Sequence, residues 1–276
     1  MELIYIKDLS KTYGKTKVLD NLSVSYESGK IYGLVGENGA GKTTLFNCIM
    51  GVTDYDGEIR KSSQMTVGYM PAESFFYSFI TGKEYLEFCI KAKGKKMDAK
   101  AIDSLNKIFQ LPLERFASDY STGMKKKLAL MSLLLQDNDL YILDEPFNGV
   151  DLYGCIQLKR IIRDLKDKGK TIIISSHLIN TLHELCDEID FLHSHRIRKR
   201  YIHASIDEIE KEILNMVEFK TNRGNVFLSY LNNHQIHALF FTSPILYYKT
   251  ILNTEIRIAN TNKVYFNFLF FYHTKR

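Results

Sequence analysis

The segment GENGAGKT, Gly36–Thr43, places the tightest constraint on what this chain can fold into. It follows an apolar run, Ile31–Val35, and precedes TTLFNCIM, whose apolar residues recur at helical spacing. Glycines here let the backbone curl so that several N–H groups point at one phosphate chain, and a helix N-terminus adds positive potential. A chance glycine turn is the alternative. The strand before the loop and the helix after it favour nucleotide binding.

Two side chains of this segment have chemistry of their own. Lys42 can reach the terminal phosphates of a nucleotide, and the hydroxyl of Thr43 is placed to bind Mg²⁺. We expect phosphate contacts from the loop and from the first turn of the following helix, namely Gly36, Asn38, Gly39, Ala40, Gly41, Lys42, Thr43 and Thr44.

A second apolar run, LYILDEP at Leu140–Pro146, ends in two adjacent carboxylates. A carboxylate at the C-terminal end of a buried parallel strand lies at the sheet edge where α/β proteins bind ligands. We expect Asp144 to hold Mg²⁺, commonly through water. We expect Glu145 to face the γ-phosphate and to polarise an attacking water as a general base. A solvated acidic turn is the alternative, and the phosphate loop earlier in the chain favours the catalytic interpretation.

His177 follows a third apolar run, TIIISS at 171–176. A histidine at that strand end can hydrogen-bond to the γ-phosphate, so we assign it a catalytic role beside Glu145. The alternative is an ordinary residue at a helix N-terminus that Ser175 or Ser176 caps. The remaining histidines have no matching acidic or cysteine partners, which argues against a metal site of the zinc type.

The order of the expected elements is typical of an α/β protein. The first 30 or so residues alternate apolar and polar, which predicts short antiparallel strands with a turn at Tyr13-Gly14. Helical spacing prevails from about 84 to 135. Apolar strands then alternate with helices, up to a last strand near DFLHSHRI, which predicts a parallel sheet with covering helices. After Ser205 come a short amphipathic helix, IDEIEKEIL, and two expected strands, EIRIAN and KVYFNFLFFYH.

Charge and composition narrow the range of partners. The net charge is only +5 and the lysines are spread out, so we expect no nucleic acid partner. The basic stretches KAKGKKMDAK and HRIRKR are typical of solvated faces, although HRIRKR could also lie near anionic lipid headgroups. No apolar run approaches the ~20 residues that span a bilayer. We also see no signal-peptide pattern and no paired cysteines among the four.

These motifs, in this order, resemble the nucleotide-binding subunit of ATP-binding cassette (ABC) transporters over roughly residues 1–200. GENGAGKT resembles the Walker A loop, LYILDEP the Walker B strand, NGVD at 148–151 the D-loop, and His177 the switch histidine. Tyr13 matches the aromatic residue that stacks on adenine. The resemblance implies ATP and Mg²⁺ as ligands and ATP hydrolysis as the reaction.

The stretch YSTGM at 120–124 stands where that family has its LSGGQ signature. In the family, this signature closes over ATP bound to a second subunit. The resemblance therefore implies that Ser121 and Gly123 bind nucleotide across a dimer. Thr122 and Met124 depart from the family pattern. The three lysines that follow are expected on an exposed helix face.

The Q-loop of the family is also altered in this chain. Ala72 stands at the position of the glutamine that helps bind Mg²⁺ and couples the cassette to the membrane subunit, and Glu73 lies beside it. The aromatic run that follows, SFFYSFITG at Ser74–Gly82, is a candidate contact with a permease. Simple core packing is the alternative, and the sequence leaves both open.

The resemblance implies a P-loop NTPase (RecA-like) fold with a parallel core sheet, an N-terminal antiparallel β-subdomain and an inserted helical subdomain at approximately 80–135. We place the ABC-type ATP-binding domain at 1–205 and a small C-terminal α+β extension of unassigned role at 206–276. The motifs look most like cassettes paired with ABC-2-type permeases. We therefore expect a homodimer at the inner face of a bacterial membrane that drives a separate permease, most often an exporter. The alternative is a soluble ATPase of this type without a permease, with an assembly or regulatory role.

Overall fold

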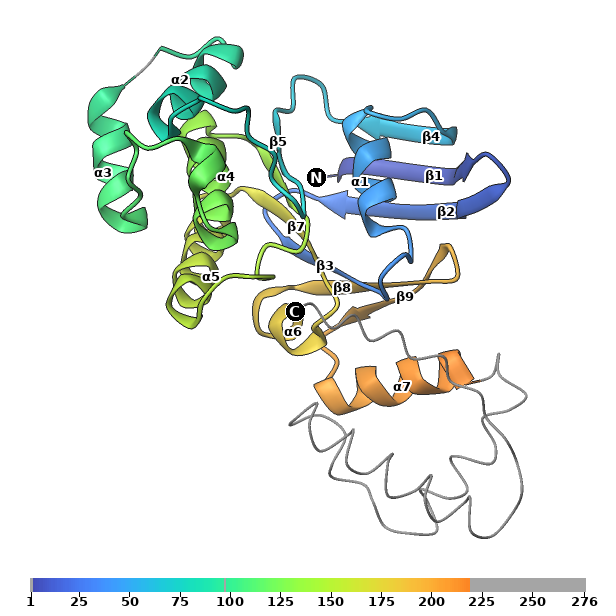
Figure 1. Ribbon diagram of the computed structural model, residues 1–276. Coiled ribbons are helices and arrows are strands. Elements are labelled where there is room, and N and C mark those ends of the chain that lie inside the picture. The colour runs from blue at the N-terminus through green and yellow to red at the C-terminus, as the bar shows by residue number, and fades with distance from the viewer. Residues whose placement is uncertain (1, 97, 219–276) are drawn as a thin grey trace, which may run out of the picture. The chain divides into compact units, whose positions relative to one another are not determined.

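The computed structural model describes residues 2–96 and 98–218, and a central sheet of six strands organises them (Figure 1). The strand order is β5-β6-β7-β3-β8-β9, and every neighbouring pair is parallel except β8 and β9. The strands are β3 (Ile31–Val35), β5 (Val67–Met70), β6 (Leu140–Leu143), β7 (Thr171–Ser176), β8 (Glu188–His193) and β9 (Arg196–Ile202). The central strands β3, β6 and β7 are buried along their whole length, as their continuous apolar runs predict.

A three-stranded antiparallel sheet, in the order β2-β1-β4, is formed by the N-terminal region. Its strands are β1 (Glu2–Tyr13), β2 (Thr16–Glu27) and β4 (Asp56–Lys61), and Tyr13 pairs with Thr16 across the β1–β2 turn. Helix α1 (Lys42–Met50) lies beside these strands (Figure 1). One apolar core joins the two sheets and the helix, and includes Ile6, Leu22, Phe46, Ile142 and Ile173.

Three helices between β5 and β6 form the inserted group: α2 (Gly82–Ala92), α3 (Ala99–Phe109) and α4 (Thr122–Gln136). Both α2 and α3 pack against α4 (Figure 1). A capping box between Thr81 and Glu84 begins α2, and the Asp98 carboxylate caps α3. The short 3₁₀ helix Ala117–Asp119 leads into α4, which begins at an N-cap, Ser121. The predicted helical region is therefore confirmed.

Helices α5 (Leu152–Asp167) and α6 (Ile179–Leu185) complete the alternation with the parallel strands. Two details differ from the expectation. The segment HLINTLHELCDEI, 177–189, predicts a longer helix than α6, which begins after Leu178, an N-cap without a side-chain cap. The last expected strand is a hairpin of two, β8 and β9, because Ser194 and His195 adopt positive φ angles and turn the chain back.

The compact unit of the described chain comprises Met1–Ile213. Helix α7 (Ile206–Glu218) forms where an amphipathic helix is expected. The two strands expected after it lie outside the described residues, so the boundary at 205 and the role of the extension stay predictions. In the part of the chain that the structure describes, no helix is both long and apolar enough to cross a membrane.

Arg200, in the basic stretch HRIRKR, is not part of a solvated face. Its guanidinium binds both carboxylate oxygens of Asp190, at 2.6 and 2.8 Å, and lies 3.0 Å from an oxygen of Glu188. The Tyr26 and Tyr32 rings lie 5.4 and 5.2 Å away. Burial raises the pKa of the Asp190 carboxyl, and the bond to Arg200 opposes that rise. This ion pair fastens edge strand β9 to the core sheet.

Replacing Arg200 with alanine should therefore destabilise the protein. The variant leaves Asp190, which is 1% exposed, as a buried charge without its partner, so the free energy of unfolding should fall by about 3–5 kcal/mol. Chemical denaturation measures this change. Arg196→Ala is the matched control, because Arg196 pairs with Asp20 near the surface, where water screens the interaction. Equal losses in the two variants would contradict this account of the cluster.

Candidate active site

The segment Gly36–Thr43 forms a tight loop between the C-terminal end of β3 and the start of α1. Two of its glycines have no room for a side chain. A Cβ at Gly36 would lie 2.5 Å from the carbonyl oxygen of Leu192, and one at Gly41 would lie 2.9 Å from that of Val18. Gly41 also has a φ of 111°, which side chains disfavour. The glycine spacing is therefore a steric requirement of this fold.

The start of α1 is suited to bind an anion. Gly41 is its N-cap and supplies no side-chain cap, and the first turn contains no acidic residue. The first N–H groups of a helix have no partner within the helix and carry the positive end of its dipole. Asn38, Gly39 and Thr43 are exposed, while Ala40 and Thr44 are half-buried. The loop thus presents backbone N–H groups at a surface that a phosphate chain can reach.

Lys42 extends from the first turn of α1 back over the loop and is buried. Its ammonium donates hydrogen bonds to the carbonyl oxygens of Gly36, at 2.8 Å, and Glu37, at 3.2 Å. It also lies 3.4 Å from Oε1 of Glu145, on the neighbouring loop after β6. The structure therefore places this cation between the phosphate loop and the acidic strand end.

Asp144 is fully buried at the end of β6, and both of its oxygens accept hydrogen bonds. The Thr43 hydroxyl donates to Oδ2 at 2.5 Å, and the Ser175 hydroxyl donates to Oδ1. A hydroxyl that donates its proton keeps lone pairs free to bind a metal. Oxygen ligands of this kind suit Mg²⁺, which takes one or two protein ligands together with substrate phosphates. The residues present therefore fit a Mg²⁺ site.

Glu145 follows with a positive φ of 46°. Its backbone N–H donates to Ser175 Oγ at 2.8 Å, and its Oε2 lies 3.0 Å from Nδ1 of His177. Its Oε1 is buried and, within the described residues, forms no hydrogen bond, since Lys42 lies beside it without hydrogen-bond geometry. A carboxylate held on one oxygen and free on the other can accept a proton from water.

Tyr13 lies at the end of β1 and is 47% exposed. The Lys11 ammonium lies 4.9 Å from the centre of its ring and is anchored by Asp54 at 2.6 Å. The hairpin that carries Tyr13 also reaches the phosphate loop, because Val18 packs on Gly41. Tyr13 thus offers an exposed aromatic ring on a hairpin that contacts the loop, and its stacking on a base remains a prediction.

The signature segment lies at the start of α4 and not among the residues that surround the phosphate loop. Ser121 is the N-cap of α4, and its hydroxyl accepts a hydrogen bond from the Met124 N–H at 3.3 Å. Gly123 lies close to the carbonyl of Gly149 in the D-loop, where a Cβ would come within 3.3 Å. In the described chain, no hydrogen bond joins Ser121 or Gly123 to the phosphate loop of the same molecule.

The structure shows the surroundings of three residues at the altered motifs, Thr122 in the signature and Ala72 and Glu73 in the Q-loop. The methyl group of Thr122 packs toward Gly149, where a Cβ would come within 3.1 Å, so the extra side chain fills space between signature and D-loop. Ala72 is half-buried and Glu73 exposed, two and three residues beyond the end of β5.

Two residues beside the carboxylates were missed by the sequence reasoning. Ser175 is not a helix cap: its hydroxyl donates to the Asp144 carboxylate and accepts from the Glu145 N–H, so it braces both residues. Ser176 accepts a hydrogen bond from the Leu178 N–H. Lys126 was expected on an exposed face, yet it is 5% exposed and its ammonium donates to the carbonyl oxygen of Glu145. Strand pairing was the available signal for Ser175, because Leu143 pairs with Ile174.

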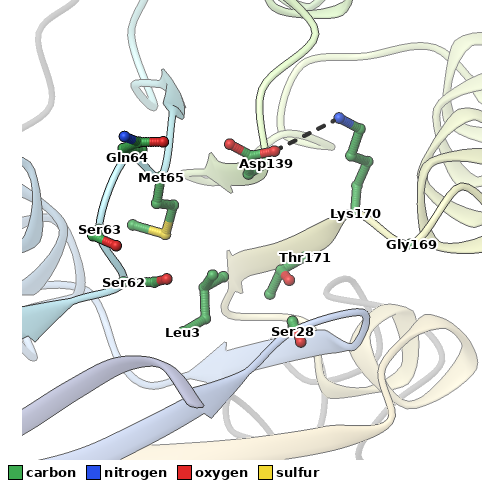
Figure 2. Close-up of a pocket in the computed structure, with 10 residues that line it drawn as sticks. All are labelled: Leu3, Ser28, Ser62, Ser63, Gln64, Met65, Asp139, Gly169, Lys170 and Thr171. Atoms are coloured by element: carbon green, nitrogen blue, oxygen red, sulfur yellow. Dashed lines mark ion pairs between the residues drawn. The ribbon is translucent and has the colours of Figure 1, made fainter. Parts of the chain in front are cut away.

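A separate cavity of about 260 Å³ lies at the other ends of the core strands (Figure 2). Asp139 and Thr171 line it, at or just before the first residues of β6 and β7. Lys170 reaches toward Asp139 in Figure 2, at 4.0 Å. Ligands of α/β sheets bind at the carboxyl ends of the strands, so this cavity is not part of the candidate site.

Comparison with known proteins identifies the class. The family model described as ABC transporter matches residues 19–148. The bacitracin transport ATP-binding protein BcrA of Enterococcus faecalis is 31% identical over 254 residues, which cover 87% of this chain and 81% of that protein. The lantibiotic transport ATP-binding protein SrtF of Streptococcus pyogenes is 29% identical over 230 residues, 80% of this chain and 100% of that protein.

A solved structure described as the ATP-binding subunit of an ABC transporter matches with a TM-score of 0.70. It is 28% identical and covers 77% of this chain and 99% of that chain. Fold and site thus define a P-loop NTPase with an inserted helical group and an antiparallel subdomain, as predicted. The chain belongs to the family of ABC transporter ATP-binding subunits, which bind and hydrolyse ATP.

Ser175→Ala should slow ATP hydrolysis with little change in ATP affinity. The variant removes one hydrogen bond to the Asp144 carboxylate and one from the Glu145 N–H, and a bond to a charged group contributes about 1.5–3 kcal/mol. We expect kcat to fall roughly 10- to 100-fold, as measured by phosphate release. Ser176→Ala is the control, since that hydroxyl binds only the Leu178 N–H among the described contacts. A kcat in Ser175→Ala equal to that of the control would show that the brace is dispensable.

Proposed function

We propose that two copies of this chain close around two molecules of ATP, with Mg²⁺, and that closure drives a separate membrane permease. The observation that carries this proposal is that, within one molecule, the signature segment is separate from the phosphate loop and the catalytic residues. Lys42, Thr43, Asp144, Glu145 and His177 gather at one sheet edge. Among the described residues, the signature segment at the start of α4 forms no hydrogen bond to that phosphate loop. A second copy would supply it.

The proposed chemistry uses each group for one task. Backbone N–H groups of the loop and the Lys42 ammonium hold the terminal phosphates. Mg²⁺, when bound beside Thr43 and Asp144, would offset the charge on the β- and γ-phosphates. Oε1 of Glu145 accepts a proton from the attacking water, while the bond from His177 to Oε2 fixes the orientation of the carboxylate.

The signature segment of the second copy would complete each site. The N-terminus of α4 presents the positive end of a helix dipole, and Ser121 is a small polar residue at that position. Such an end favours an anionic ligand, and a γ-phosphate presented by the partner meets this requirement. Tyr13 would stack on the adenine at the other end of the nucleotide.

An aromatic surface at Phe75, Tyr77 and Phe79 supports a permease contact. These side chains are 79%, 72% and 80% exposed, which is unusual for large apolar groups next to one another. Phe76 is buried and stacks edge-on with Tyr85 at 4.8 Å, so only this one ring serves core packing. We infer that the exposed rings receive a permease helix at the inner face of the membrane.

Export is the direction we propose, because the motifs resemble cassettes paired with ABC-2-type permeases. BcrA is described as a bacitracin transport protein and SrtF as a lantibiotic transport protein. Both are ATP-binding subunits, and this chain aligns with most of their length. We propose that this chain likewise energises an exporter from the cytoplasmic side of a bacterial membrane.

Glu145→Gln should abolish turnover while ATP still binds. The amide cannot take a proton from water, but it keeps the size of the carboxylate, so closure around ATP should persist. We expect hydrolysis to fall at least about 100-fold and a dimer to accumulate with ATP and Mg²⁺, as measured by light scattering. Glu73→Gln, on the exposed segment after β5, is a control for loss of one carboxylate. Unchanged turnover in Glu145→Gln would exclude Glu145 as the base.

Phe75→Ser combined with Phe79→Ser should weaken binding to the membrane without slowing hydrolysis. The two rings are exposed in the isolated subunit, so their removal costs no core packing. We expect a smaller fraction of the chain to sediment with membranes of cells that express the whole transporter. Val52→Ser, which removes a side chain that is 71% exposed at the end of α1, is the matched control. Equal sedimentation of both variants would exclude the aromatic surface as the contact.

A further inference from the structure

Lys126 is a buried cation within the helical group. It lies in α4, five residues after Ser121, and is 5% exposed, whereas its neighbours Lys125 and Lys127 are only half-buried. Burial lowers the pKa of its ammonium, and the nearby Glu145 and Asp144 carboxylates counteract this. Burying a charge costs free energy unless the charge is paired and hydrogen-bonded. Its ammonium donates a hydrogen bond of 2.5 Å to the carbonyl oxygen of Glu145.

The residue that Lys126 binds has an unfavourable backbone conformation. The φ of Glu145 is 46°, in the left-handed region that costs a residue other than glycine about 1–2 kcal/mol. Such a conformation persists only where its surroundings hold it. Ser175 holds the N–H of Glu145, while Lys126 and the Asn148 N–H, at 3.2 Å, hold its carbonyl oxygen. Of these groups, only Lys126 comes from the helical group.

The direction of the Glu145 side chain depends on this backbone. Its carboxylate sits between the Lys42 ammonium and His177 Nδ1, at 3.4 and 3.0 Å, and the proposed role as base depends on this placement. A displacement of about 1 Å at a reacting group can cost 100-fold in rate. Relaxation of the Glu145 peptide toward a more favourable φ would therefore move the base.

We propose that Lys126 is a positioning residue for hydrolysis: its ammonium holds the Glu145 peptide in the left-handed conformation that aims the carboxylate. This inference rests on the proposed role of Glu145 as the base. Lys126 and Ser121 belong to the start of the same helix. A movement of α4 as Ser121 meets the partner's ATP would thus be transmitted to Glu145 of its own chain.

Lys126→Met tests this role, because methionine is similar in length but has neither charge nor donor. We expect kcat to fall at least tenfold, while the dissociation constant for ATP changes less than twofold. The melting temperature should stay the same or rise, because burying methionine avoids the desolvation cost of an ammonium. A merely structural role predicts that melting temperature and kcat fall together. Lys126→Arg, which keeps a cationic donor, should be several-fold more active than Lys126→Met.

Lys125→Met is the matched control on the same turn of α4 and should keep parental kcat. The proposal would be overturned by parental kcat in Lys126→Met, by an equal loss in Lys125→Met, or by a loss that tracks a fall in melting temperature. An Arg variant that folds but is no more active than the Met variant would also overturn it. The role of Glu145 is tested separately by Glu145→Gln, so either result there leaves the comparison between Lys126 and Lys125 interpretable.

Discussion

The buried carboxylate of Asp144 is the point on which the site depends. It accepts hydrogen bonds from Thr43, at the start of α1, and from Ser175, near the end of β7. Three segments that are distant in sequence therefore meet at one group. Because β6 and β7 are parallel neighbours and β3 follows in the sheet, their carboxyl ends bring the phosphate loop, the acids and His177 to one edge. The parallel sheet thus determines the geometry of the site.

Glu145 extends this arrangement by one residue. Its side chain lies between a cation and an imidazole, and its backbone is held by groups from β7 and α4. The left-handed conformation stores a small strain that the surrounding contacts maintain. Helix α4 also begins at the signature Ser121, for which the described part of the chain shows no hydrogen bond to its own phosphate loop. One helix therefore joins the surface that we propose for a second copy with Glu145, the proposed base of its own site.

Local motifs were readable from the sequence because their chemistry is local. The glycine spacing of Gly36–Thr43 and the carboxylates after LYIL follow directly from strand, loop and helix signals, and the core sheet and helical group were predicted correctly. Ser175 and Lys126 act on residues 31 and 19 positions away in sequence, through strand pairing and helix packing, so no local pattern reveals them. Lys126 was misassigned because three consecutive lysines resemble a solvated face, and only the helix orientation shows which one points inward. The strands expected after α7 stay untested predictions.

A complementation measurement tests most directly whether each site is built from two chains. Lys42→Ala removes the cation that we propose holds the phosphates. Ser121→Asp keeps a helix cap but places a negative charge against the partner's phosphates. Each variant alone should hydrolyse ATP poorly. Mixed in equal amounts, they should regain hydrolysis, because a mixed dimer has one site with Lys42 from one chain and Ser121 from the other. A mixture no more active than its separate components would contradict a site shared between two copies.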